Sequence, residues 1–211
     1  MANERGFRGD KSYQRRGKPI RQPRLRILIV CEGAKTEPIY FKELRSAKRI
    51  PAEVEICGEE CGSHPKNVVE YALAKKKLAI SDKLPYDQIW CVYDRDVHVN
   101  IDQARMQAKA NNIQEAFSVP CFELWFLLHF KCHTAHIERD KVVSELKKHL
   151  PGYEKGMKVF GILPVCAIAL HNAERIRRNH LSAGMSTDSN PSTTVDRLVA
   201  VLNEIAKMNT G

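Results

Sequence analysis

The chain has 211 residues, of which 43% are hydrophobic and 28% charged, and its formal net charge is +9. This length suits one compact α/β domain with an additional tail or subdomain. No apolar run is long enough to span a membrane, and the N-terminus lacks the apolar segment of a signal peptide, which argues against membrane-spanning and secreted classes.

The positive charge is concentrated at the N-terminus. Residues 1–26 contain nine Lys and Arg residues against Glu4 and Asp10, so they carry seven of the nine net charges. Segment 1–25 has few apolar residues and no periodicity, and we expect it to be a disordered basic arm. The arm is either a solubilising leader or a contact to nucleic-acid phosphates. Its candidate phosphate-binding residues are Arg15, Arg16, Lys18, Arg21 and Arg24.

Strands and helices are expected to alternate through residues 26–119. The predicted strands cover 26–31, 52–57, 87–94 and 113–118. The predicted helices between them begin at Pro38, cover 66–79, and extend from Asp102 to about 111. The continuous apolar run 26–31 is typical of a parallel strand that is covered on both faces. We therefore predict an α/β fold of Rossmann-like type, with a central, mostly parallel four-stranded sheet flanked by helices.

Residues 120–211 are predicted to form a helical C-terminal part that packs on this core. Its expected helices cover 120–130, 138–149, 165–180 and 191–208, with Pro120 and Pro191 in first turns. Seven cysteines, several in apolar stretches, indicate buried thiols in a reducing compartment and not a disulfide framework. We expect a cytoplasmic protein with no membrane contact.

Acidic residues follow two of the predicted strands. Glu32 ends the first strand, and the third ends in Asp94-Arg95-Asp96. Ligand sites of parallel sheets lie beyond the carboxyl ends of the strands. Residues i and i+2 of an extended chain point to one side, so Asp94 and Asp96 present two carboxylates together. Such oxygen ligands suit Mg²⁺ or Mn²⁺, although an isolated D-x-D is often only a solvated turn.

The turn "GAKT" after Glu32 looks at first like a phosphate-binding loop. A P-loop needs G-x-x-x-x-G-K-[ST], and this turn has one glycine and is too short. The charge of Glu32 would also repel a phosphate unless a metal ion bridged the two groups. Lys35 of this turn is a candidate contact to nucleic acid.

Five motifs in order, "IVCEGAKTEPIYF", "CVYDRD", "SVPCFELWFLLHF", "YEKG" and "NPSTTVDRLV", resemble the RloB-like proteins, a branch of the Toprim superfamily. The resemblance covers residues 25–203. It implies a Toprim-like fold and a Mg²⁺-dependent nuclease of prokaryotic anti-phage defence by abortive infection, often with an ABC-type ATPase partner. The superfamily's acidic residues match Glu32, Asp94 and Asp96, which would hold the metal and serve catalysis.

Related overcoming-lysogenization-defect nucleases use two metals, further acids and a lysine. The resemblance assigns these metal-ligand roles to Glu37 and Glu123 and the catalytic lysine to Lys155, although the second acid of the first motif lies where this chain has Thr36. Glu123 could instead be an ordinary acid in a helix first turn. Lys155 could stabilise charge on a transition-state phosphate or be a surface lysine.

The segment "DSNPSTT" combines hydroxyl groups with a predicted helix N-terminus. Asn190, Ser192 and Thr193 are therefore candidate phosphate contacts. Asn190 before Pro191 is equally an ordinary helix cap.

The expected activity is hydrolysis of a nucleic-acid phosphodiester, in DNA, tRNA or other RNA. Two alternatives remain open at this point. One is an RNA-maturing Toprim nuclease that acts without an ATPase. The other is a non-catalytic Toprim adaptor that docks an ATPase or DNA, and homo-oligomerisation is also left open.

Overall fold

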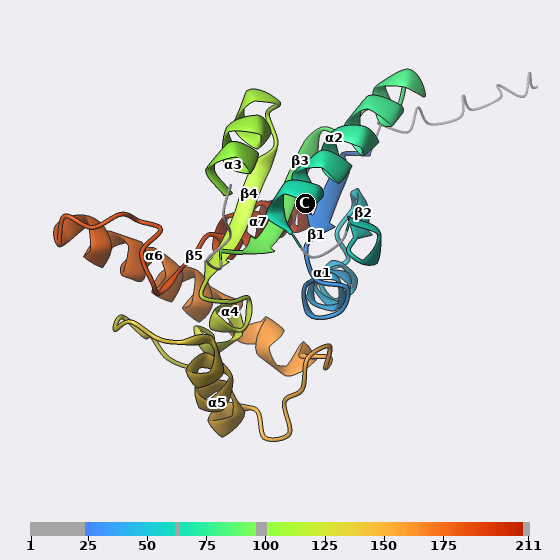
Figure 1. Ribbon diagram of the computed structural model, residues 1–211. Helices are drawn as coiled ribbons and strands as arrows, with labels where there is room; N and C mark the ends of the chain where they lie inside the picture. The colour runs from blue at the N-terminus through green and yellow to red at the C-terminus, as the bar shows by residue number, and fades with distance from the viewer. Residues whose placement is uncertain (1–23, 62–63, 96–100, 209–211) are drawn as a thin grey trace, which may run out of the picture.

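The computed structural model describes residues 24–61, 64–95 and 101–208. Its centre is a sheet of five strands in the order β2-β1-β3-β4-β5 (Figure 1). The strands are β1 (Arg26–Cys31), β2 (Glu53–Cys57), β3 (Gln88–Asp94), β4 (Gln114–Val119) and β5 (Ser192–Thr193). The first four are parallel, and β5 is antiparallel to β4. The predicted α/β class with a mostly parallel sheet is confirmed.

Helices cover both faces of the sheet and form most of the C-terminal part. They are α1 (Thr36–Ala47), α2 (Pro65–Ser81), α3 (Ile101–Ala110), α4 (Glu123–Leu127), α5 (Arg139–His149), α6 (Cys166–Ser182) and α7 (Val195–Lys207). Two 3₁₀ helices also occur in the described residues. η1 (Glu59–Cys61) lies between β2 and α2, and η2 (Phe160–Val165) lies between α5 and α6. In the described part of the chain, no helix is long and apolar enough to cross a membrane.

The alternation of side chains along the strands builds two cores. Ile27 and Ile29 of β1 face a large core formed with α1, α4, α6 and α7. Leu28 and Val30 face a smaller core with α2 and α3. A strand whose two faces are both buried needs apolar residues at every position, which explains the continuous run in the sequence. The thiols of Cys31 and Cys91 are buried in this sheet, as predicted.

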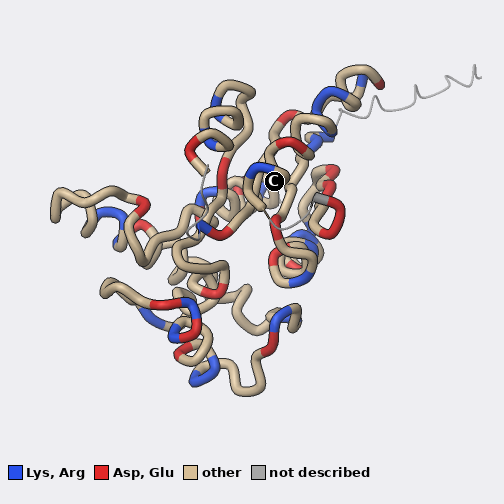
Figure 2. The backbone as a smooth tube through the Cα atoms, in the orientation of Figure 1, with Lys and Arg blue, Asp and Glu red and all other residues tan. Residues whose placement is uncertain are grey.

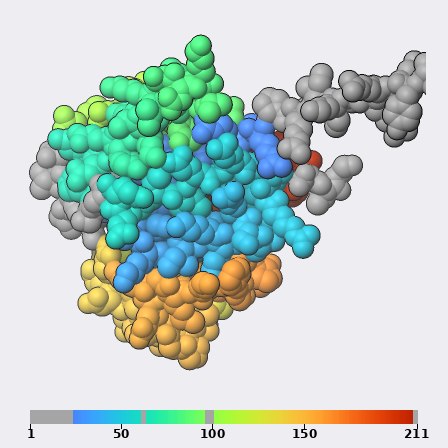
Figure 3. All heavy atoms as spheres, turned by 90° about the vertical axis from the view of Figure 1, so that its right-hand side faces the viewer, coloured from blue at the N-terminus to red at the C-terminus, as the bar shows by residue number. Residues whose placement is uncertain are grey.

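An aromatic cluster joins α1 to α4 beneath the carboxyl ends of the strands. The rings of Tyr40 and Phe122 pack edge to face at 5.8 Å, and those of Phe126 and Tyr153 do so at 6.0 Å. Edge-to-face pairs add stabilisation to the burial of the rings themselves. The C-terminal part thereby lies directly against the N-terminal elements, as the yellow and orange residues beside the blue ones show (Figure 3).

Two helices begin three or more residues later than the sequence predicts. The helix predicted from Pro191 begins at Val195, because the preceding residues join the sheet. The N–H of Thr194 donates to Phe117 O (2.8 Å), and the N–H of Phe117 donates to Thr194 Oγ1 (3.0 Å). These bonds hold Ser192–Thr193 extended as β5, a strand that the sequence did not predict. Likewise, the helix predicted over 120–130 is shorter and covers only Glu123–Leu127.

Charged residues of both signs are interspersed over the described elements (Figure 2). One ion pair is buried and ties α6 to α7. Nη1 and Nη2 of Arg177 donate to the two carboxylate oxygens of Asp196, at 2.8 and 2.7 Å. Arg177 Nη1 also donates to Thr193 O. The two residues are only 8% and 7% exposed. This pair therefore fixes α7 and β5 against the rest of the fold.

We predict that Arg177→Ala lowers the free energy of unfolding by about 3–5 kcal/mol, because it leaves the buried Asp196 carboxylate unpaired. The matched control is Arg178→Ala, since Arg178 is exposed and pairs with Glu174 across one helical turn. This control should cost less than about 1 kcal/mol. Urea unfolding measures both, and equal small losses would contradict the structural role of the Arg177–Asp196 pair.

Candidate active site

A pocket of about 500 Å³ lies at the carboxyl ends of β1 and β3. Four carboxylates and three cationic side chains line it together with parts of the "GAKT" turn. They are Glu32, Glu37, Asp94 and Glu123, with Lys35, Arg139 and Lys155. The sequence analysis placed all of these except Arg139 at the site. The pocket draws on the turn after β1, the ends of β3 and β4, and the loops and helix starts of the C-terminal part.

Glu32 connects the ends of the two central strands. Its backbone N–H donates to Val92 O (2.8 Å), which continues the ladder between β1 and β3. The backbone N–H of Asp94 in turn donates to Glu32 Oε2 (2.9 Å). The Glu32 carboxylate therefore lines the pocket and also accepts a hydrogen bond from the backbone of Asp94. This bond fixes the backbone from which the Asp94 side chain projects.

Asp94 is an acid of the pocket whose pKa is raised well above its ordinary value. Its side chain is 15% exposed, and Oδ2 lies 3.2 Å from Arg139 Nη2. Oδ1 is buried and meets no hydrogen-bond partner among the described residues. Burial first, and then the nearby Glu37 carboxylate, raise the pKa of Asp94 well above its ordinary value, while Arg139 opposes that rise. A buried carboxylate of this kind has a strong need for positive charge.

Glu37 lies in the first turn of α1 and is buried. Burial raises the pKa of Glu37, and Glu123 adds to the rise, whereas Lys155 and Arg139 lower it. A side chain at Gly33 would place its Cβ only 2.3 Å from Glu37 Oε2. The glycine of the "GAKT" turn therefore makes room for the Glu37 carboxylate, a role that the comparison with phosphate loops does not reveal.

Glu123 and Lys155 approach the pocket from the C-terminal part. Glu123 is 3% exposed and accepts a hydrogen bond from the Tyr153 hydroxyl (3.3 Å). The N–H of Gly156 donates to Thr36 Oγ1 (3.2 Å), which attaches the "YEKG" loop to the start of α1. Lys155 is exposed at the rim, next to the buried acids. The loop thus holds a positive charge beside Glu37.

Arg139, the first residue of α5, was not singled out from the sequence. Its Nη2 lies within reach of both Asp94 Oδ2 (3.2 Å) and Pro120 O (3.3 Å). The segment "HIERDK" resembles an ordinary charged helix start, and no motif marks its arginine. Only the tertiary structure brings this residue to the end of β3.

The remaining predicted site residues have different outcomes. Asp96 and the arm residues Arg15, Arg16, Lys18 and Arg21 lie outside the described residues. Arg24 is exposed just before the amino end of β1, whereas the pocket follows its carboxyl end. Lys35 is exposed and lines the pocket, in keeping with a contact to an incoming anion.

The candidate phosphate contacts near β5 are used within the fold. Asn190 exchanges two hydrogen bonds with the backbone of Ile137, both 3.0 Å long. The Ser192 hydroxyl donates to Thr187 O (2.6 Å), and the Thr193 hydroxyl donates to Phe117 O (3.1 Å). Ser192 and Thr193 are buried, so a phosphate would reach their hydroxyls only if these bonds opened.

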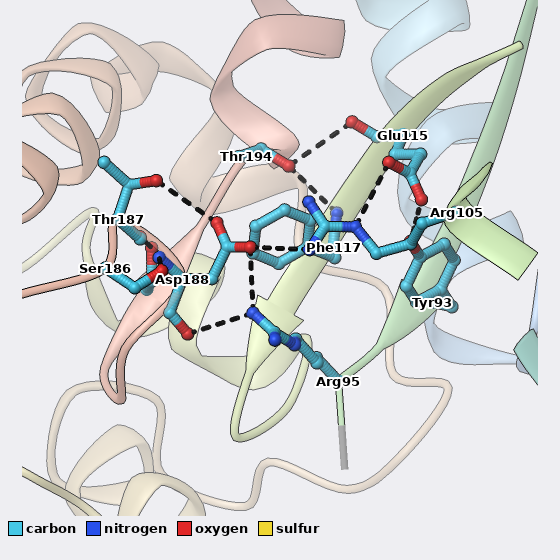
Figure 4. Close-up of polar contacts among 10 residues, drawn as sticks. Tyr93, Arg95, Arg105, Glu115, Phe117, Ser186, Thr187, Asp188 and Thr194 are labelled. Carbon is cyan, nitrogen blue, oxygen red and sulfur yellow. Dashed lines mark hydrogen bonds and ion pairs between the residues drawn. The ribbon is translucent and has the colours of Figure 1, made fainter. Parts of the chain in front are cut away.

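A polar network on the far side of β3 anchors the residue that follows Asp94 (Figure 4). Arg95 Nη1 lies 2.9 Å from Asp188 Oδ2, and Arg105 Nη1 lies 2.7 Å from the same oxygen. Arg105 also pairs with Glu115 (3.5 Å), which accepts a hydrogen bond from the Tyr93 hydroxyl. Arg95 is thus a salt-bridged side chain, and it ties the end of β3 to the loop before β5.

The donor set of the pocket suits a hard divalent cation, because it consists of carboxylate oxygens. The buried Oδ1 of Asp94, which has no partner within the described ranges, is an oxygen that such a cation would satisfy. As they stand, no three His, Cys, Asp or Glu side chains of the described residues are grouped closely enough to hold a metal ion. The chemistry of these donors fits a cation, although their present spacing does not form a metal site.

Comparison with known proteins gives one family. A family model described as "RloB-like protein" matches residues 27–202, which is most of the chain and includes every described acid of the pocket. No curated protein and no solved structure matches the chain.

We predict that Asp94→Asn stabilises the protein at neutral pH in EDTA by about 0.5–2 kcal/mol, the usual size of such gains at functional sites. The folded protein binds the Asp94 proton more tightly than the unfolded chain, whose carboxyl titrates near 3.8. Wild type therefore loses stability as the pH rises from that value through the raised pKa, and the variant is spared this loss.

Thermal melts between pH 4 and 8 test this dependence. The difference between variant and wild type should grow with pH, and the exposed carboxylate of Asp82, changed to Asn, is the matched control. If Asp94→Asn were no more stable than wild type at any pH, the claim that the buried Asp94 charge destabilises the folded protein would be wrong.

Proposed function

The chain belongs to the RloB-like family, and from that premise we propose that it is a divalent-metal-dependent nuclease that hydrolyses nucleic-acid phosphodiesters. The observation that carries the proposal is the gathering of Glu32, Glu37, Asp94 and Glu123 in one pocket at the carboxyl ends of the parallel strands. Ligand sites of parallel sheets lie beyond the carboxyl ends of the strands, and titratable groups perturbed by burial and by charged neighbours mark candidate functional sites.

In this proposal Glu32 and Asp94 hold Mg²⁺ or Mn²⁺ together with Asp96, which follows Asp94 in the D-x-D motif. Glu37 and Glu123 supply further carboxylates for a second ion. A bound ion lowers the pKa of its water and offsets charge on the phosphate. Glu32 keeps Asp94 in place through the backbone hydrogen bond described above.

The positive side chains at the rim meet the anionic substrate. Lys155 lies beside Glu37 on the "YEKG" loop, where its ammonium group can offset charge that develops on the phosphate. Lys35 of the "GAKT" turn lines the same pocket. The basic segment 1–26 supplies further, sequence-independent attraction to the nucleic-acid backbone.

The biological setting belongs to the same proposal. We place the protein in the cytoplasm as the effector of an anti-phage system of abortive-infection type, with an ABC-type ATPase as its partner. DNA and tRNA or other RNA are the candidate substrates. A nuclease of this kind is expected to be silent without its partner, because unrestrained cleavage would harm the host.

We predict that Glu32→Gln and Asp94→Asn each reduce cleavage by roughly 10²-fold or more, the usual effect of removing a charged group that acts in the transition state. The assay incubates each protein with labelled plasmid, single-stranded DNA or total tRNA in Mg²⁺ or Mn²⁺. Each reaction is run with and without the proposed ABC-type ATPase partner. The exposed Glu204, changed to Gln, is the control and should leave the rate unchanged.

The three functional hypotheses give different results in this assay. Cleavage of one structured RNA without an ATPase would favour an RNA-maturing nuclease. Absence of cleavage under every condition, together with no binding of Mn²⁺, would contradict the nuclease proposal and favour a docking adaptor.

A further inference from the structure

Arg139 brings a permanent positive charge from the C-terminal part into the pocket of the α/β core. Its side chain is 32% exposed, and its Nη2 contacts Asp94 Oδ2 at 3.2 Å. The same nitrogen lies 3.3 Å from Pro120 O, just after β4. A guanidinium group remains protonated at any ordinary pH, so its positive charge is always present beside Asp94.

The electrostatics of the pocket single out this arginine. Arg139 lines the pocket together with four acids and places its Nη2 3.2 Å from Asp94 Oδ2. Lys155 is a second cation of the same pocket. Arg139 thus provides Asp94 with the stabilisation that a bound divalent cation would provide.

The ion pair uses only half of the carboxylate. Arg139 contacts Oδ2, whereas Oδ1 is buried without a hydrogen-bond partner in the described part of the chain. A cation that bound Asp94 would satisfy Oδ1 and would also place a like charge next to the guanidinium group. Because Arg139 is partly exposed and keeps its contact with Pro120 O, it can move away from Asp94 without losing every partner.

We propose that Arg139 is the resident counter-ion of Asp94 and competes with the divalent cation for this carboxylate. The inference rests on the proposed metal-dependent function and adds a resting state to it. In that state Arg139 pairs with Asp94. The cation concentration needed to fill the site is then higher than it would be if the carboxylates had no arginine beside them. The C-terminal part then controls metal binding through the position of α5.

The test is the affinity of the purified full-length chain for Mn²⁺, measured by calorimetry and by the electron paramagnetic resonance signal of free Mn²⁺. We expect Arg139→Ala to bind Mn²⁺ about 10-fold more tightly than wild type or better, because the cation no longer competes with the guanidinium charge for Asp94. If Arg139 instead supported a metal ligand, its loss would weaken binding by about 10–100-fold. Arg139→Lys, which keeps the charge, should stay close to wild type.

The matched control is Lys141→Ala, which removes the same charge from an exposed position of the same helix. It should leave the Mn²⁺ affinity within about twofold of wild type, because it does not line the pocket. Circular dichroism melts in EDTA verify that each variant is folded, and Arg139→Gln provides a second variant if Arg139→Ala unfolds. Arg139→Gln removes the charge and keeps hydrogen-bond donors, so it should also bind Mn²⁺ more tightly than wild type, and an affinity equal to wild type would overturn the counter-ion role.

The outcomes separate this inference from the proposed function. Equal Mn²⁺ affinity of wild type and Arg139→Ala, or weaker binding by the variant, would overturn the counter-ion role and leave the metal site standing. Failure of wild type and every variant to bind Mn²⁺ would overturn the proposed function and the counter-ion role with it.

Discussion

The burial of a carboxylate at the carboxyl end of β3 is the constraint on which the rest of the site depends. Asp94 lies among three other acids, and burial makes its charge costly. Such a charge persists in a folded protein only when opposite charge is near. Arg139 meets this need by pairing with the Asp94 side chain, whereas Glu32, itself an acid, fixes the Asp94 backbone.

The fold brings these groups together by packing the C-terminal part beneath the strand ends. The aromatic contacts between Tyr40 and Phe122 attach α4 to α1, so that Glu123 and Glu37 approach each other from different helices. The bond from Gly156 to Thr36 attaches the loop that carries Lys155. The acids of the site are therefore held together by the apolar packing around them, whereas the Arg139 side chain is partly exposed.

Much of the fold follows from local sequence patterns. The apolar run 26–31 could be assigned to a buried parallel strand because both of its faces are covered. The same logic placed Glu32 and Asp94 at one edge, since parallel strands end on the same side of a sheet. Glu37, Glu123 and Lys155 came from family resemblance, and the structure places all three in the pocket.

The remaining features depend on contacts between distant segments. Pro191 resembled a helix start, but the extended hydrogen bonds of Thr194 with Phe117 determine that segment, and no local pattern encodes them. Arg139 lies 45 positions beyond Asp94 and carries no motif. A glycine is needed at position 33 because the Glu37 side chain occupies the space that a Cβ would take. That requirement follows from the folded structure. Strand pairs and ion pairs of this kind become visible only in three dimensions.

The most direct measurement of the central claim is a crystal structure of the full chain in Mn²⁺, with anomalous diffraction recorded at the manganese absorption edge. The carboxylate site predicts an anomalous peak within bonding distance of Asp94, with the Arg139 guanidinium displaced from Oδ2. A pocket without an anomalous peak at saturating Mn²⁺, in which Arg139 still contacts Asp94, would contradict the claim that these carboxylates form a metal site.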